Sequence, residues 1–240
     1  MLLMCHIFIG LIIGLLLFQI LKDRRVIGLA AIGSILPDLI DKPLGHIVLS
    51  GTLDYGRIYA HSGLFLIAIL ALGFMYHQRK STWIMMALAA GLVSHLLLDS
   101  MWELPVTMFY PLLGDFGAHH FPNYIENSLL REIENAYEWI FGVSALAMLV
   151  FTYREKLGRF NKDITRFAPM TMKNLAILVV VTAFLSVLSA AMGSYNPLSR
   201  SSGVESNLII GISGMVGGFF SYRIWARYNS EETITVPLNH

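Results

Sequence analysis

Long apolar stretches separated by short polar segments make up most of this chain. There are seven such stretches, at about residues 2–21, 26–40, 58–76, 82–101, 137–153, 174–192 and 207–225. A helix needs about 20 mostly apolar residues to cross the hydrocarbon core of a membrane, with about 17 as a lower limit. The pattern therefore predicts an all-α, polytopic integral membrane bundle with about seven transmembrane segments.

The second of these segments differs from the others. It is short for a full span, and Pro37 and Asp38 interrupt its apolar pattern. Proline removes a backbone donor and disturbs a helix interior. We therefore expect residues 26–40 to form a short or broken segment, tilted or partly re-entrant.

The first segment is predicted to be a retained anchor helix. Residues 2–21 contain no Asp, Glu, Lys or Arg, and the cluster Lys22-Asp23-Arg24-Arg25 follows them. A signal peptide carries its positive charge before the apolar stretch and small residues at a cleavage site. Here the positive charge comes afterwards, which favours a permanent span.

The positions of Lys and Arg predict the orientation, because basic residues collect in cytoplasmic loops. If all seven segments cross and the N-terminus lies outside, 13 of the 17 basic residues are cytoplasmic. The exceptions are Lys42, Arg57, Arg131 and Arg200. Omitting the second segment would move Arg79 and Lys80 outside and break the pattern. We therefore predict seven spans in the inner (plasma) membrane, with the N-terminus out and the C-terminus in.

Composition supports a membrane protein and excludes several other classes. Of the 240 residues, 55% are hydrophobic and 14% are charged, whereas soluble domains usually carry roughly 25% charged residues. A formal net charge of +1 is too small for a nucleic-acid binder. The single cysteine, Cys5, excludes a disulfide framework and a cysteine-based zinc cluster.

The chain is predicted to have two regions. Residues 1–136 carry most of the polar chemistry and include a long outer loop, residues 102–136. Residues 137–240 are expected to form three further spans and a short polar tail. Small residues in the last span allow close helix contact: Gly211, Gly214, Gly217 and Gly218.

Histidines and carboxylates gather on the predicted outer face. Six of the eight histidines lie there, namely His6, His46, His61, His95, His119 and His120. The outer acids include Asp38, Asp41, Asp99, Glu103 and Glu126. Ionisable groups at membrane depth are costly and mark functional sites. Because the orientation follows from Lys and Arg alone, this clustering is separate support for a site.

Spacing suggests which of these residues act together. His95 and Asp99 are four residues apart, which places an imidazole and a carboxylate on one face of a helix. Zinc accepts both ligand types. A buried His–Asp hydrogen bond between helices explains the pair equally well. Asp38 and Asp41 flank the broken end of the second segment and also suit a polar helix cap.

His61 and His6 lie near outer helix ends, where a histidine alone is more often a cap or an interface residue. Taken together, however, four helix ends on one face present His, Asp or both. That combination favours a metal centre over chance. We expect a divalent metal, with zinc as the first candidate, held by residues from His6, Asp38, Asp41, His61, His95 and Asp99.

The ordered motifs resemble the YdjM-like family of membrane-bound metal-dependent hydrolases. They are His6, Leu36-Pro-Asp-Leu-Ile-Asp41, Arg57-Ile-Tyr-Ala-His-Ser62, Ser94-His-Leu-Leu-Leu-Asp99 and Tyr110-Pro111. The resemblance spans roughly residues 1–115. Each motif alone is a weak signal of the family, and the specificity comes from their combination. It implies a polytopic metal-dependent hydrolase.

That family is more distantly similar to zinc-dependent phospholipases C and nucleases, which are helical and cleave phosphoesters. The positions carried over are His6, Asp38, His61, His95 and Asp99. Two departures stand out: Gly56 and Ala60 replace the family's His and Thr, and residues 100–105 lack a further His. A complete three-zinc centre is therefore not expected. His119, His120 and Glu126 are candidates for completing a second metal site.

These observations lead to a functional prediction, a metal-dependent hydrolase at the outer membrane face. Its substrate is expected to be a phosphoester, for which membrane lipids are the natural source. Asp41 or Glu103 would act as general base and Arg57 would pair with a phosphate oxygen. Two alternatives remain from the sequence: a metal- or proton-coupled transporter, and a non-catalytic membrane protein with a structural metal.

Overall fold

The computed structural model describes residues 3–119, 121 and 123–235, and within these ranges the secondary structure is helical apart from one isolated β-bridge between Asn196 and Ser201. The chain separates into two compact units, Met1–Glu134 and Asn135–His240.

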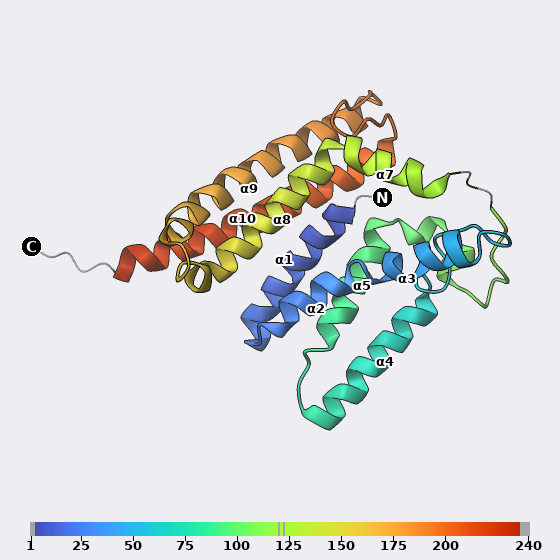
Figure 1. Ribbon diagram of the computed structural model, residues 1–240, viewed down its shortest axis with the longest axis horizontal. Coiled ribbons are helices and arrows are strands. Elements are labelled where there is room, and N and C mark those ends of the chain that lie inside the picture. The colour runs from blue at the N-terminus through green and yellow to red at the C-terminus, as the bar shows by residue number, and fades with distance from the viewer. Residues whose placement is uncertain (1–2, 120, 122, 236–240) are drawn as a thin grey trace, which may run out of the picture. The chain divides into compact units, whose positions relative to one another are not determined.

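The first unit contains both long and very short helices (Figure 1). Its elements are α1 (Leu3–Leu21), α2 (Arg25–Gly33), α3 (Leu36–Pro43), the π-helix η1 (Leu44–Val48), α4 (Gly63–Lys80), α5 (Met86–Leu98), the 3-10 helix η2 (Met101–Glu103), α6 (Pro105–Met108) and α7 (Tyr124–Glu134).

Three helices, α1, α2 and α5, pack side by side and form the centre of this unit (Figure 1). Their contact is close because small residues lie at the crossings. A Cβ atom on Gly91 of α5 would fall on the carbonyl oxygen of Ala30 and 2.8 Å from the backbone nitrogen of Ser34. Gly91 therefore lets the backbones of α5 and α2 touch.

The predicted break in the second segment is present. Residues 26–40 are divided between α2 and α3, with Ser34 and Ile35 between them. Pro37 lies in the first turn of α3, where its missing N–H leaves no helical hydrogen bond unmade. The chain thus begins a new helix at this point, and Asp38 and Asp41 belong to it.

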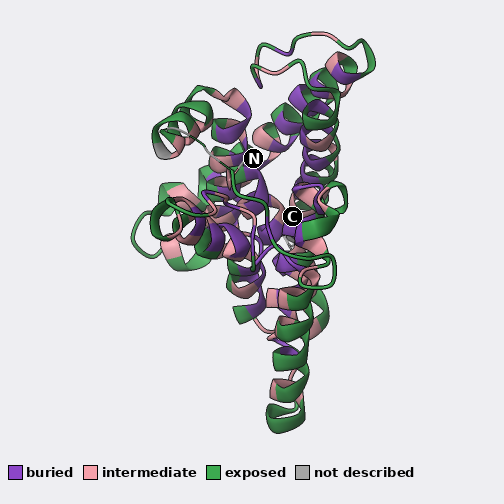
Figure 2. Ribbon diagram, turned by 90° about the vertical axis from the view of Figure 1, so that its right-hand side faces the viewer, coloured by how far each residue is buried: buried purple, intermediate pink, exposed green. Residues whose placement is uncertain are grey.

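Helix α4 has a largely uncovered surface. Gly73 is its single buried residue, and in Figure 2 this helix extends lowest and is mostly green and pink. Its start is well defined, because the Ser62 hydroxyl accepts a hydrogen bond from Phe65 N at 3.2 Å. This cap places His61 just before the helix.

The second unit is a three-helix bundle of α8 (Ala136–Leu157), α9 (Lys162–Ala191) and α10 (Val204–Thr235). A buried polar network joins one end of it: Asn196 Nδ2 donates to Tyr137 Oη, Ser186 Oγ and Asn207 Oδ1 at 3.2–3.4 Å. The predicted close glycine contact is seen at Gly211, where a Cβ would lie 3.0 Å from the Ala183 carbonyl oxygen.

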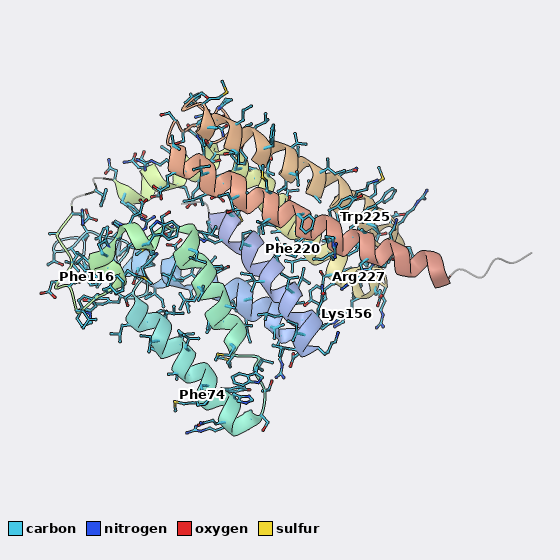
Figure 3. All side chains as sticks on the ribbon, turned by 180° about the vertical axis from the view of Figure 1, so that it is seen from behind. Phe74, Phe116, Lys156, Phe220, Trp225 and Arg227 are labelled. Atoms are coloured by element: carbon cyan, nitrogen blue, oxygen red, sulfur yellow. The ribbon has the colours of Figure 1, made fainter. Side chains whose placement is uncertain are left out.

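Basic and aromatic side chains gather at the other end of this bundle. Lys156, Trp225 and Arg227 lie there together (Figure 3). The Arg154 guanidinium carbon is 3.7 Å from the centre of the Tyr228 ring, and Lys173 Nζ is 4.9 Å from the Trp225 ring. Arginine, lysine and aromatic rings are characteristic of a membrane interface.

Four helices of the described chain are long and apolar enough to cross a membrane. They are Leu3–Leu21, Ala136–Leu157, Lys162–Ala191 and Val204–Asn229. The helices in the other three predicted segments are shorter or less apolar; α5, for example, has 13 residues. The all-helical membrane character is confirmed, whereas the count of seven spans and the orientation stay predictions.

The Gly91 crossing makes a prediction about stability. Gly91→Ala should lower the apparent Tm of the detergent-solubilised protein, because overpacking a close contact costs roughly 1–3 kcal/mol. Gly28 in α2 is the matched control, since no atom lies within 4 Å of a Cβ added there. Gly28→Ala should be neutral or stabilising, because Ala favours a helix by roughly 0.5–1 kcal/mol over Gly. Equal thermal shifts for the two variants would contradict this account.

Candidate metal centre

Four buried side chains of the first unit converge on one point. Asp38, His61, His95 and Asp99 each offer a ligand atom, and these four atoms lie within 4.8 Å of one another. They come from α3, from the residue preceding the Ser62 cap of α4, and from the last turn and end of α5. Residues from three separate elements thus meet in the interior.

Asp41 holds His61 in place. Its Oδ1 accepts a hydrogen bond from Ala60 N at 3.0 Å, and its Oδ2 accepts from Ile58 N at 2.9 Å and His61 N at 3.1 Å. The same Oδ2 lies 2.7 Å from His61 Nδ1. Asp41 is fully buried. The segment before α4 therefore wraps around the Asp41 carboxylate, and the same carboxylate fixes the orientation of the His61 imidazole.

The break between α2 and α3 orients the second histidine. Ser34 lies in that break, and its carbonyl oxygen is 2.7 Å from Nδ1 of the buried His95. A carbonyl oxygen can only accept a hydrogen bond, so Nδ1 of His95 carries the proton. In metal sites, partners of this kind fix the tautomer and direction of a ligating imidazole.

The two histidines consequently point their other nitrogens at each other. In both rings Nδ1 faces an acceptor, which leaves Nε2 of each neutral ring as a lone pair. These two Nε2 atoms are 3.2 Å apart. Two lone pairs at that distance repel unless a cation lies between them. The contact therefore calls for either a metal ion or a protonated imidazole.

Two carboxylates complete the cluster. Asp38 Oδ1 lies 3.6 Å from His61 Nε2 and 3.9 Å from His95 Nε2. Asp99 Oδ2 lies 3.7 Å and 3.8 Å from the same two nitrogens. Ligands about 2.0–2.2 Å from a tetrahedral zinc ion are about 3.3–3.6 Å apart, so these spacings are close to those of a metal site.

Asp38 Oδ1 also lacks a hydrogen-bond partner among the described residues. A buried polar atom without a partner costs free energy, and a buried charge costs more. A divalent ion at the point of convergence would satisfy this oxygen and both imidazole lone pairs. The donor set, two imidazoles and two carboxylates, is one that zinc accepts. The residues present therefore fit a divalent metal.

His6 lies beside the cluster. Its Nε2 is 3.2 Å from Asp99 Oδ1, and its ring stacks on that of His95 with centres 4.3 Å apart. It thus contacts the carboxylate oxygen of Asp99 that faces away from the two histidines, and it is not one of the four convergent residues. In this arrangement His6 orients Asp99.

Two cations also contact the carboxylates, Lys42 on the Asp38 oxygen turned away from the histidines and Arg57 on the Asp99 oxygen that faces them. Lys42 Nζ is 3.1 Å from Asp38 Oδ2, and Arg57 Nε is 3.2 Å from Asp99 Oδ2. Burial lowers the pKa of Lys42, but the Asp38 carboxylate outweighs this effect and raises the pKa above its usual value. Lys42 is therefore a cation at neutral pH.

The remaining predicted residues lie outside the four-residue group. Glu103 is exposed in η2, after Asp99, and Glu126 is exposed on α7. His119 is exposed and stacks on Tyr55, with ring centres 4.3 Å apart. His120 lies outside the described residues.

Two contributors to the centre, Lys42 and the Ser34 carbonyl, lie outside the residues predicted from the sequence. Lys42 was detectable, because it follows Asp38 by four residues and this spacing places both on one helix face. The Ser34 carbonyl left no signal in the sequence, because any residue at the break would present the same backbone group.

Comparison with known families yields a match that agrees with the motifs. The sequence model of a family described as YdjM inner membrane protein matches residues 1–220. Comparison with curated proteins and with solved structures gave no match. The family match confirms the resemblance inferred from the motifs and extends beyond residue 115 into α10, the last helix of the second unit. The chain therefore belongs to the YdjM inner membrane protein family.

Proposed function

We propose that this protein is a membrane-embedded, metal-dependent hydrolase. The observation that supports this best is the convergence of Asp38, His61, His95 and Asp99, with both histidines fixed through Nδ1. Such an arrangement aims two imidazole lone pairs and two carboxylates at one point. When bound, a divalent ion such as zinc supplies Lewis-acid chemistry, activating water and polarising a phosphoryl oxygen.

The substrate we propose is a phosphoester, with a membrane lipid as one source. Arg57 supports this choice, because its side chain contacts Asp99 and remains 32% exposed. A guanidinium that reaches from a metal ligand to an accessible surface is suited to pair with a phosphate oxygen. The predicted sorting of acids and histidines to the outer face supports an extracytoplasmic site.

The geometry changes the proposed roles of the two candidate general bases. Asp41 receives three backbone N–H groups and His61 Nδ1, so we assign it the positioning of His61. Glu103 is exposed and follows Asp99 by four residues. Of the two candidates this leaves Glu103, whose side chain is accessible to solvent, as the proposed general base.

Metal content is the first test. Purified protein should contain about one divalent ion per chain, measured by inductively coupled plasma mass spectrometry, and His95→Ala and Asp38→Asn should lose most of it. His119→Ala, which changes an exposed histidine outside the cluster, should retain it. Wild-type protein that folds without metal would indicate instead that a protonated His61 holds the cluster together.

The role of Asp41 is tested separately. Asp41→Asn should weaken metal affinity roughly 10- to 100-fold, as is usual when a partner of a ligating histidine is replaced, while the four ligands stay in place. Competition against a chelator of known affinity measures the change. A complete loss of bound metal at saturating zinc would show that Asp41 is itself a ligand.

Hydrolysis is the decisive test of the function. Metal-loaded protein should cleave members of a panel of phosphoesters, chelation should abolish cleavage, and His95→Ala should lower kcat/KM by at least about 10³-fold, since it removes a metal ligand. Glu103→Gln should lower kcat by roughly 10²–10⁴-fold with metal content unchanged. Metal flux into liposomes without hydrolysis would favour the transporter alternative and overturn the proposal.

A further inference from the structure

A polar pocket lies next to the metal cluster, within the first unit. Its volume is about 350 Å³. It is lined by the end of α3 and η1, by residues 55–57 and by α7. None of the described lining residues is one of the four metal-ligand candidates, and the proposed function gives a role to only one of them, Arg57.

Stacking and hydrogen bonds join the walls of the pocket. The ring of His46 stacks on that of Tyr124 with centres 3.4 Å apart. Asp54 joins the two sides, since its Oδ1 is 2.9 Å from His46 Nδ1 and its Oδ2 accepts a hydrogen bond from Phe121 N at 2.7 Å. These contacts fix the start of α7 against the segment that follows α3, so that the pocket has defined walls.

Two cations of the pocket reach the metal cluster directly. Lys42 and Arg57 both line it, and they pair with Asp38 and Asp99 respectively. A ligand in the pocket would therefore contact side chains that also contact two of the four metal-ligand candidates. No rearrangement of the helices is needed for this connection.

A third cation has no such role. Arg131 on α7 lines the pocket and is exposed, and within the described part of the chain no ion pair engages it. Glu132 is the one carboxylate among the described lining residues. Arg131 thus offers its guanidinium to a ligand, with five N–H donors suited to phosphate geometry.

The balance of charge indicates the charge of the ligand. Lys42 and Arg57 are offset by Asp38 and Asp99, and Glu132 offsets Arg131. A divalent ion bound to Asp38 and Asp99 would offset these two carboxylates, which leaves three cations against one carboxylate, Glu132, in the lining of the pocket. Asp41 and Asp54 lie outside this lining, and the carboxylate of each accepts a hydrogen bond from a backbone N–H group. A phosphate monoester carries between about −1.5 and −2 at pH 7, whereas a phosphodiester carries about −1.

We propose that this pocket binds the phosphate group of a phosphate monoester, with Arg131 as the residue that selects for it. This inference deepens the proposed function and rests on it, because the metal supplies the charge that the ligand balances. Metal and phosphate should therefore bind cooperatively. Tyr55, Phe121 and Tyr124 form apolar walls for the remainder of the ester.

The test measures binding and does not depend on turnover. Inorganic phosphate is titrated by calorimetry into full-length, zinc-loaded protein in phosphatidylcholine nanodiscs. Arg131→Gln should weaken phosphate binding about tenfold or more, because a charge-assisted bidentate contact is lost, with metal content unchanged. Arg131→Lys, which keeps the charge, should recover part of the affinity.

The matched control is Arg79→Gln, which removes an exposed arginine from the far end of α4, outside the pocket. It should bind phosphate as the wild type does. An equal loss in Arg79→Gln and Arg131→Gln would reveal non-specific charge attraction and overturn the inference. Unchanged affinity in Arg131→Gln would overturn it as well.

Competition identifies the source of the phosphate. Displacement by soluble glycerol 3-phosphate supports a free phosphate ester, displacement only by short-chain phosphatidic acid supports a lipid, and displacement by neither overturns the inference. The two proposals fail separately. If the metal-loaded protein hydrolyses phosphoesters but does not bind phosphate at Arg131, only this inference is overturned. If the protein never binds metal, the proposed function is overturned.

Discussion

The metal cluster depends on the break in the chain between α2 and α3. Ser34 caps the C-terminal end of α2, and its carbonyl oxygen meets His95 Nδ1 at 2.7 Å. The new helix that begins there carries Asp38 into the cluster and Asp41 beneath His61. A continuous helix through residues 26–40 would provide neither the freed carbonyl nor the change of direction. The helix break that interrupts the apolar pattern therefore positions the residues of the site.

Burial gives the cluster its chemical character. Asp38, His61, His95 and Asp99 are all buried, in a protein with few charged residues. Removing such groups from water is costly unless other charges or hydrogen bonds compensate. Here the compensation comes from Asp41 and Ser34 on the histidines and from Lys42 and Arg57 on the carboxylates. These neighbouring groups fix the direction of each candidate ligand atom before any ion binds. The cluster is therefore better suited to hold a metal ion than a set of mobile polar side chains would be.

Local sequence patterns predicted the helices and the kinds of side chain in the site. Apolar stretches indicated the membrane helices, Pro37 indicated the break, and the spacing of His95 and Asp99 placed both on one face of α5. Local patterns did not distinguish Asp38 from Asp41, since both lie on α3, three residues apart. The difference arises because one carboxylate faces the histidine nitrogens and the other faces the backbone of residues 58–61.

The sequence by itself therefore determined the helical membrane character of this protein, the family to which it belongs, and the chemistry available to its first half. The tertiary structure decided which of those residues converge, which of them only position others, and that Arg131 shares a pocket with Lys42 and Arg57. The physical reason is that periodicity and spacing are properties of single helices. Convergence, in contrast, depends on close helix crossings such as the one at Gly91 and on where the chain turns between helices.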